Sequence, residues 1–187
     1  MKKIAYQIIF TVITLLLLGS AVFAQEYVAP IKPIETGRSP GVKVKLIGQN
    51  GTSKTYALVF AKGDEILSGL TEFAQKNNVK NARFTAIGDA MTARVGWYDK
   101  GKKMFKVIPI TEPAEITSLV GDIAVYNNKP AVHAHINLAT QDGIVHGGHL
   151  LEAFIFPTLE VMLTTEDTPL YKKLYEEAGA GIIDPEL

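Results

Sequence analysis

The sequence contains no cysteine. This absence excludes disulfide bonds, thiolate nucleophiles, iron–sulfur clusters and thiolate zinc sites, so any bound metal must use histidine and oxygen ligands. An excess of charge is also absent, because 19 Lys and Arg residues balance 19 Asp and Glu residues in a chain of 187. A strongly basic nucleic-acid-binding protein is therefore disfavoured. With 47% hydrophobic residues, 9 prolines and 16 glycines, the composition is that of one ordinary globular domain.

Three common catalytic or cofactor-binding motifs are missing or lie outside their usual structural context. The sequence has no glycine-rich phosphate loop and no Gly-x-Gly-x-x-Gly fingerprint, and its one Gly-x-Ser-x-Gly match, residues 37–41, lies in a proline-containing segment and not between a strand and a helix. Hydrolases, kinases and dehydrogenases that depend on these motifs are therefore poor matches to the chain.

The N-terminal segment has the pattern of a secretory signal peptide. Lys2 and Lys3 precede an apolar run over residues 8–18, and the small residue Ala24 places the predicted cleavage site before Gln25. The alternative is an uncleaved membrane anchor, which is disfavoured because the run is shorter than the roughly 20 residues that a spanning helix needs. We therefore expect a signal peptide over residues 1–24, a secreted or periplasmic protein, and no stable membrane anchor after cleavage.

Cleavage also changes the charge balance of the chain. The removed segment contains Lys2 and Lys3 but no acidic residue, which leaves 17 basic against 19 acidic residues, a formal charge of −2. An exported, slightly acidic protein is not expected to bind nucleic acid.

The mature chain divides into an arm and one domain. Residues 25–41 contain Pro30, Pro33 and Pro40 and predict an extended arm, and residues 42–187 predict the domain. One amphipathic helix is expected after Asp64, which could act as its cap, and a second over residues 170–178. Between them the pattern predicts short strands: residues 83–87, 93–98, 104–108, 114–126, 131–138, 149–156 and 159–164. Because helices do not alternate with these strands, we predict an α+β fold with a mainly antiparallel β-sheet, one helix packed on it and a C-terminal helix.

All four histidines lie close together in the sequence. In the predicted strand over residues 131–138, His133 and His135 project to one face, with Cα atoms about 7 Å apart, so both rings can converge on one cation. His149 opens the next strand and can supply a third imidazole. Three histidines with an open coordination position form a ligand set used for catalytic zinc, although imidazole suits copper, nickel and iron too. His146 is the fourth histidine, and its role stays open.

Two other interpretations of the histidines remain. The side chains could hydrogen-bond one another or the backbone at a subunit interface. A cupin-like metal site would also begin with His-x-His, but it needs a glutamate a few residues later, and residues 137–140 contain no carboxylate.

Several motifs occur in an order that is informative as a set. They are Ala86-Ile87-Gly88, Gly96-Trp97-Tyr98-Asp99, the segment from Glu115 to Gly121, His133-x-His135, Gly147-Gly148-His149-Leu150 and Leu159-Glu160-Val161. Together, between about Val42 and Thr164, they resemble the prokaryotic type of the plants-and-prokaryotes conserved (PPC) domain family, formerly a domain of unknown function.

The resemblance implies an α+β fold, a homotrimer, metal binding by His133, His135 and His149, and the label of a DNA-binding protein. His146 is not part of the family pattern. In plants the label belongs to proteins that join this domain to an AT-hook with an Arg-Gly-Arg-Pro motif. The corresponding segment here, residues 37–40, has a single arginine. The DNA-binding label therefore lacks its usual physical basis in this chain.

The candidate catalytic residue is Glu115, which could accept a hydrogen bond from a ligating histidine or act as a general base on metal-bound water. The alternative is a solvated carboxylate at a strand end. Trp97 is expected in the core. Taken together, we expect an exported trimeric domain that binds zinc or another divalent transition metal and has a small-molecule ligand. The two alternatives are a DNA-binding protein and a metal-dependent lyase or hydrolase.

Overall fold

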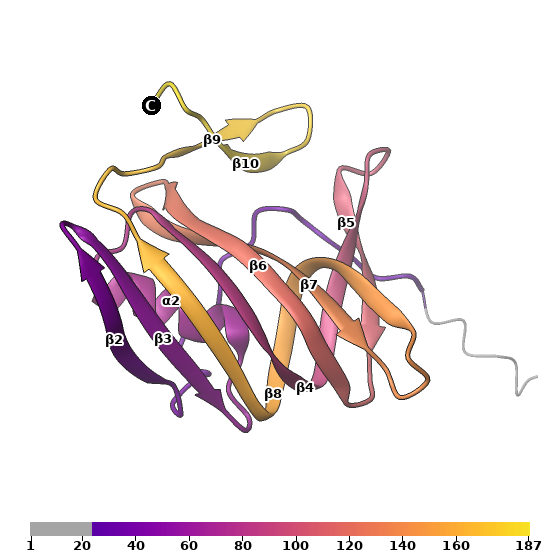
Figure 1. Cartoon of the computed structure of the whole chain (residues 1–187). Coiled ribbons are helices and arrows are strands. Elements are labelled where there is room, and N and C mark those ends of the chain that lie inside the picture. Colours follow the sequence, from indigo (N-terminus) through magenta and orange to yellow (C-terminus); the bar gives the residue numbers. More distant parts are fainter. Residues whose placement is uncertain (1–23) are drawn as a thin grey trace, which may run out of the picture.

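A curved antiparallel sheet wraps around one helix in the computed structural model, which describes residues 24–187 (Figure 1). The predicted signal peptide lies outside the described residues, except for Ala24. The elements are β1 (Tyr27–Val28), β2 (Lys43–Asn50), β3 (Ser53–Ala61), α2 (Ile66–Lys76), β4 (Ala82–Asp99), β5 (Met104–Ile110), β6 (Ala114–Tyr126), β7 (Lys129–Ala139), β8 (Val145–Thr165), β9 (Lys172–Tyr175) and β10 (Ala180–Ile183). Within the described part of the chain, no helix is both long and apolar enough to cross a membrane.

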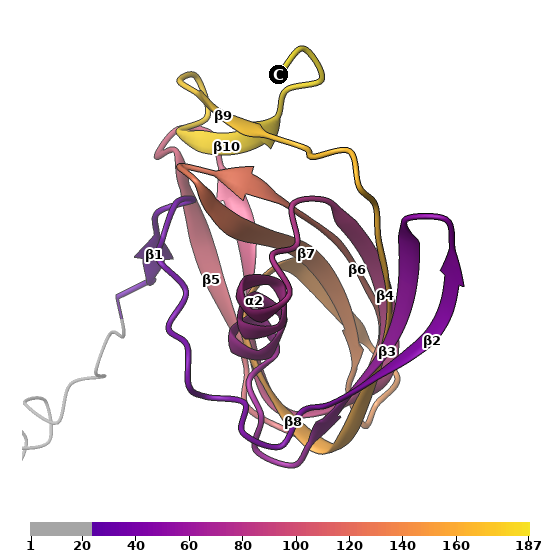
Figure 2. The ribbon, with the colours of Figure 1, turned by 90° about the vertical axis from the view of Figure 1, so that its left-hand side faces the viewer.

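The main sheet has eight strands in the order β1-β5-β4-β6-β7-β8-β3-β2, and β4 also pairs with β8. Because β4 pairs with both β6 and β8, the pairings around β4, β6, β7 and β8 return to their starting strand, and the sheet curves around α2 (Figure 2). All pairs of these strands are antiparallel, which confirms the predicted mainly antiparallel sheet with one helix packed on it.

Two long strands replace four of the predicted short ones. The predicted strands at 83–87 and 93–98 are the two halves of β4, and those at 149–156 and 159–164 are parts of β8. The pairing register between β4 and β8 shifts three times, between Gly88 and Ala90, Ala90 and Thr92, and Arg94 and Val95. Such bulges bend a strand without ending it. The residues at a bulge interrupt the alternating pattern in the sequence, and in the sequence alone this interruption indicates a turn between two short strands. Trp97, expected in the core, is 60% exposed because it lies beyond the last buried residue of β4.

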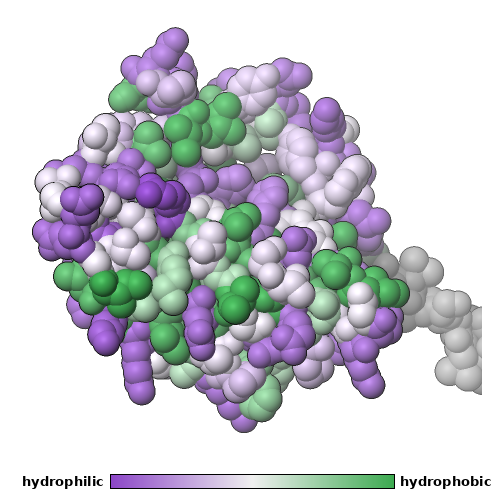
Figure 3. Space-filling view, viewed as in Figure 1, coloured by the Kyte–Doolittle hydropathy of each residue, from purple (hydrophilic) through white to green (hydrophobic). Residues whose placement is uncertain are grey.

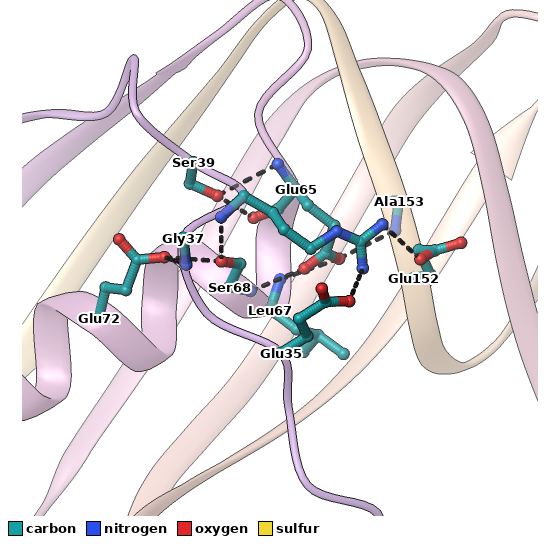
Figure 4. A network of polar contacts seen from close by, with 10 residues as sticks. Glu35, Gly37, Ser39, Glu65, Leu67, Ser68, Glu72, Glu152 and Ala153 are labelled. Carbon is teal, nitrogen blue, oxygen red and sulfur yellow. Dashed lines mark hydrogen bonds and ion pairs between the residues drawn. The ribbon is translucent and has the colours of Figure 1, made fainter.

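The helix α2 begins one residue later than the predicted cap indicates. Its N-cap is Glu65, whose carboxylate accepts hydrogen bonds from the backbone N–H groups of Leu67 and Ser68 in the helix and of Ala153 in β8 (Figure 4). Glu65 is 2% exposed, and this burial raises the pKa of its carboxyl group. The carboxylate of Asp64 instead accepts hydrogen bonds from the backbone N–H groups of Gly41, at the end of the arm, and of Ala61 in β3. Through its hydrogen bond with Ala153, the N-cap residue Glu65 also attaches the helix to β8.

The predicted C-terminal helix over residues 170–178 is wrong. This segment forms a hairpin of β9 and β10, which lies across one end of the main sheet (Figures 1 and 2). Leu170 exchanges backbone hydrogen bonds with Lys80 and Val125, and a turn returns the chain after Tyr175. A single short helix has little stability by itself, so these tertiary partners decide the local structure against helix propensity.

The predicted arm lies along the domain. β1 pairs with β5, and the side chain of Gln25, the first residue of the predicted mature chain, donates a hydrogen bond to the carbonyl oxygen of Val107 at 2.8 Å. Further along, Arg38 forms an ion pair with Glu152 on β8 at 2.8 Å. The arm is thus attached to the sheet at both ends.

Candidate metal centre

The alternation predicted for β7 is present in the structure. Ala134, Ile136 and Leu138 are buried beneath the sheet, whereas His133 and His135 are exposed on its outer face. In a strand, side chains of every second residue share a face, so the apolar set fixes the direction of the two histidines.

His149 joins these two residues through the pairing of β7 with β8. It lies directly opposite His135 in the register, and cross-strand partners of this kind have side chains on the same face. The preceding residue must be small, because a Cβ atom on Gly148 would lie 2.7 Å from the carbonyl oxygen of Gly96 in β4. Glycine at this position therefore lets β8 fit between β7 and β4 and brings His149 to the other two histidines.

The three histidines form a compact group. One ring nitrogen from each of His133, His135 and His149 can be chosen so that all lie within 4.8 Å of one another. The ring centroids are 5.1 to 5.7 Å apart. On its other side, His149 stacks on Phe105, with ring centroids 4.3 Å apart and planes at 3°. The predicted group of three imidazoles from two neighbouring strands is thus present.

The electrostatics of the group favour the neutral form of two rings, those of His149 and His135. Burial, followed by the charges of His133, His135 and Lys172, lowers the pKa of His149 to about 3. Burial and the charge of His133 also lower the pKa of His135. A neutral imidazole has a free lone pair, which is the form that binds a metal ion.

A carboxylate and an ammonium group that the sequence analysis missed lie beside the histidines. Asp122 on β6 is opposite His133, and its Oδ2 atom lies 3.4 Å from His133 Nδ1. Its Oδ1 atom lies 2.8 Å from Nζ of Lys172 on β9. Burial by itself would raise the pKa of Asp122, but the contacts with His133 and Lys172 outweigh it and hold this pKa below its usual range. No local sequence pattern links these three residues, because the register of three separate strands brings them together.

The other candidates lie outside the group. Glu115 pairs with Ala139 at the far end of β6, five residues and therefore about 16 Å along the strand from Val120, which lies opposite His135. His146 lies opposite Leu138 and is not a member of the group of three. The carboxylate beside the histidines is therefore Asp122, and Glu115 lies farther along β6.

The residues present fit a transition metal ion. The Nδ1 atom of His149 is buried and has no hydrogen-bond partner among the described residues, although buried polar atoms are nearly always paired. A metal ion would supply the missing partner. A ligand set of three imidazole nitrogens suits zinc, copper, nickel or iron better than calcium or magnesium, which prefer oxygen ligands.

Comparison with known proteins gives one family and several solved structures. The sequence model of the Plants and Prokaryotes Conserved (PCC) domain matches residues 48–167, which include all three histidines. The structure is similar to a plant- and prokaryote-conserved (PPC) protein from Pyrococcus horikoshii, with 29% identity, a TM-score of 0.67 and coverage of 82% of this chain and 100% of that one. It is also similar to a metal-containing protein from Archaeoglobus fulgidus, with 27% identity, a TM-score of 0.65 and coverage of 76% and 97%.

A third similar structure supports only the assignment of the fold, because its sequence identity is low. It is a "putative DNA binding protein" from Bacteroides thetaiotaomicron, with 21% identity, a TM-score of 0.72 and coverage of 79% of this chain and 99% of that one. No curated protein matches the chain at a significant level.

Proposed function

Since the chain belongs to the Plants and Prokaryotes Conserved (PCC) domain family, we propose that it is an exported member that binds a divalent transition metal ion, such as zinc, through His133, His135 and His149. The observation that carries this proposal is the convergence of three imidazole nitrogens within 4.8 Å, one of them on a buried ring whose Nδ1 lacks a partner. The metal-containing relative from Archaeoglobus fulgidus, 27% identical to this chain, supports it.

The arrangement of the three histidines indicates what chemistry a bound metal could supply. Three protein ligands leave a coordination position for water or for a small-molecule ligand, and a zinc ion bound in this way lowers the pKa of its water to about 7. The chain's own contribution is to favour the neutral form of His135 and His149 and to hold the three rings in place. Asp122 contacts the remaining nitrogen of His133, and Phe105 fixes the plane of His149.

Two other functions gain less support from the structure. A metal-dependent lyase or hydrolase needs a general base, and Glu115, the candidate, lies at the far end of β6. The protein from Bacteroides thetaiotaomicron is described as a DNA-binding protein, but its identity to this chain is only 21%, which supports a shared fold and not a shared function. The full chain has no excess of positive charge, which is the usual basis of affinity for phosphates. Binding to duplex DNA that persists at physiological salt would favour this alternative.

Metal analysis tests the proposed function. We expect the purified protein, after incubation with zinc and dialysis, to retain about one ion per chain. The double variant His133→Ala, His135→Ala should retain almost none, because a single remaining imidazole cannot hold the ion. Inductively coupled plasma mass spectrometry measures the content. Equal and negligible metal in both proteins would overturn the proposal, and His146→Ala, outside the group, is the control that should keep its metal.

Export is the second part of the proposal. It rests on the lysines and the apolar run before Ala24. N-terminal sequencing of the protein recovered from the periplasm or the medium should begin at Gln25. Recovery of only the full-length chain in the cytoplasm would contradict export.

The outer face of the sheet supports the homotrimer that the family resemblance implies. Val120, Thr85 and Met162 follow one another across β6, β4 and β8 in the same row as His135. Val120 and Met162 are 50% and 47% exposed, and the neighbouring Ile87 is 63% exposed. Figure 3 shows apolar side chains gathered over this face of the sheet, the side away from α2. Exposed apolar patches of this kind mark contacts with other molecules.

We therefore expect this face to hold three copies of the chain together, with the metal centre near the subunit boundary. The double variant Val120→Glu, Met162→Glu should reduce the mass in solution from three chains to one, because it places charges in the contact. Light scattering coupled to size exclusion measures the mass. The control Ile182→Glu changes an exposed apolar residue of β10 and should leave the mass unchanged. A wild-type mass of one chain would contradict the trimer.

A further inference from the structure

The hairpin of β9 and β10 follows the segment that the family model matches, which ends at residue 167. It nevertheless lies across one end of the main sheet (Figure 1), where Lys172 contacts Asp122 on β6. Its first strand begins with Lys172, whose side chain is 4% exposed. A lysine is rarely buried to this degree unless its ammonium group is paired, and here the partner is the carboxylate of Asp122 at 2.8 Å.

A first route of contacts leads from the hairpin to His133. The ammonium group of Lys172 contacts one oxygen of Asp122, and the other oxygen of the same carboxylate lies 3.4 Å from His133 Nδ1. With Nδ1 directed at the carboxylate, Nε2 of His133 is the nitrogen left for the metal. Carboxylates in this position commonly fix the orientation of a ligating imidazole. Lys172 in turn limits the positions that the carboxylate can take.

A second route leads from the hairpin to His149. The hydroxyl group of Tyr98 donates a hydrogen bond to the carbonyl oxygen of Ala178, in the loop of the hairpin, at 2.7 Å. The ring of Tyr98 packs edge-on against Phe105 with centroids 5.6 Å apart, and Phe105 stacks on His149. The two routes share no residue, and they end on two different ligands.

We propose that the C-terminal hairpin is a clamp on the metal centre and that Lys172 is a positioning residue, which orients His133 through Asp122. The proposal rests on the proposed metal site, because it assigns a role toward the metal ligands. It adds a segment beyond the family domain to the site. A purely structural hairpin would leave metal binding unchanged when the Lys172 contact is removed.

The direction in which the metal affinity changes, when the charge of Lys172 is removed, distinguishes a positioning role from simple charge repulsion. Removing a positive charge near a cation site should by itself strengthen metal binding. Loss of positioning has the opposite effect, because Asp122, 29% exposed, is then free to turn toward solvent and release His133. Weaker binding after removal of the Lys172 charge therefore identifies positioning.

The test is a zinc titration of the full mature protein in competition with a chromophoric chelator. We expect Lys172→Met to weaken zinc binding about tenfold or more, as is typical when a residue that supports a metal ligand is lost. Lys172→Arg should restore most of the affinity because it keeps the charge. Lys173→Met is the matched control, since this neighbouring side chain is 70% exposed, and it should bind zinc as the wild type does. Tyr98→Phe tests the second route and should weaken binding without unfolding the protein.

The visible absorption spectrum of the cobalt-substituted protein gives a second readout, because it reports the geometry of the ligands. Lys172→Met should change it, and Lys173→Met should not. Unchanged affinity and spectrum in Lys172→Met, with tight binding in the wild type, would overturn the clamp alone. Absence of zinc binding in the wild type would overturn the proposed function itself.

Discussion

Replacement of His149 by phenylalanine should weaken zinc binding about 100- to 1,000-fold. A set of four zinc ligands contributes about 10–16 kcal/mol, or about 2.5–4 kcal/mol per ligand, and each 1.4 kcal/mol is a factor of ten. The variant should nevertheless fold, because a phenyl ring can keep the stacking on Phe105 and removes a buried nitrogen that lacks a hydrogen bond. Isothermal titration calorimetry with zinc measures the affinity.

The same variant should resist acid better than the metal-free wild type. The folded-state pKa of His149 is about 3, below the 6.5 of an ordinary histidine, so protons bind more strongly to the unfolded chain. The stability of the wild type is therefore highest above about pH 6.5 and falls as the pH drops from there toward 3. At about 1.4 kcal/mol per pH unit, His149 alone removes about 2 kcal/mol between pH 7.5 and 5.

Urea unfolding of both metal-free proteins at pH 7.5 and 5 measures this difference. We expect the free energy of unfolding to fall by about 2 kcal/mol less in His149→Phe than in the wild type. Equal losses in the two proteins would show that His149 is not held neutral by burial. His146→Phe, outside the group of three, controls for the loss of a histidine and should bind zinc as the wild type does.

The sequence predicted the centre of this site better than its surroundings. His133 and His135 could be placed on one face because strand alternation is local, and His149 because glycines precede it on the following strand. Membership of the family, predicted from the order of the motifs, is confirmed by the match over residues 48–167. Asp122 and Lys172 could not be found in this way, since only the registers of β6, β7 and the C-terminal hairpin place them at the site.

The difference between local sequence patterns and tertiary contacts also explains which parts of the fold were predicted correctly. The helix α2 was predicted because an apolar stripe at helical spacing is a local property, and the structure confirms it. Residues 170–178 carry a similar local signal, but Leu170 bonds to Lys80 and Val125, and these distant partners select a hairpin. The catalytic role of Glu115 stays a prediction, for a residue that the structure places about 16 Å along β6 from Val120, the partner of His135.

Gly121→Ala should destabilise the protein by about 3 kcal/mol or more. Gly121 lies in β6, next to the β7 segment that carries His133, and a Cβ atom there would lie 2.3 Å from the carbonyl oxygen of His133 and 2.4 Å from Cζ of Phe84. Neither neighbour can yield easily, since one is strand backbone and the other is a buried ring. Overpacking of a well-filled core costs about 1–3 kcal/mol and more when backbone must shift. The midpoint of urea unfolding, at unchanged slope, measures the loss.

A matched substitution separates this contact from the general effect of adding a methyl group. Gly48 also lies in a strand, but the nearest atom to a Cβ there would be Cβ of Thr55 at 3.9 Å, which is ordinary contact. Gly48→Ala should therefore be neutral or stabilise the protein by up to about 1 kcal/mol, because it restricts the unfolded chain. Equal midpoints for the two variants would refute the close approach at Gly121. A displaced His133 backbone should also lower the zinc affinity of Gly121→Ala, whereas Gly48→Ala should keep it.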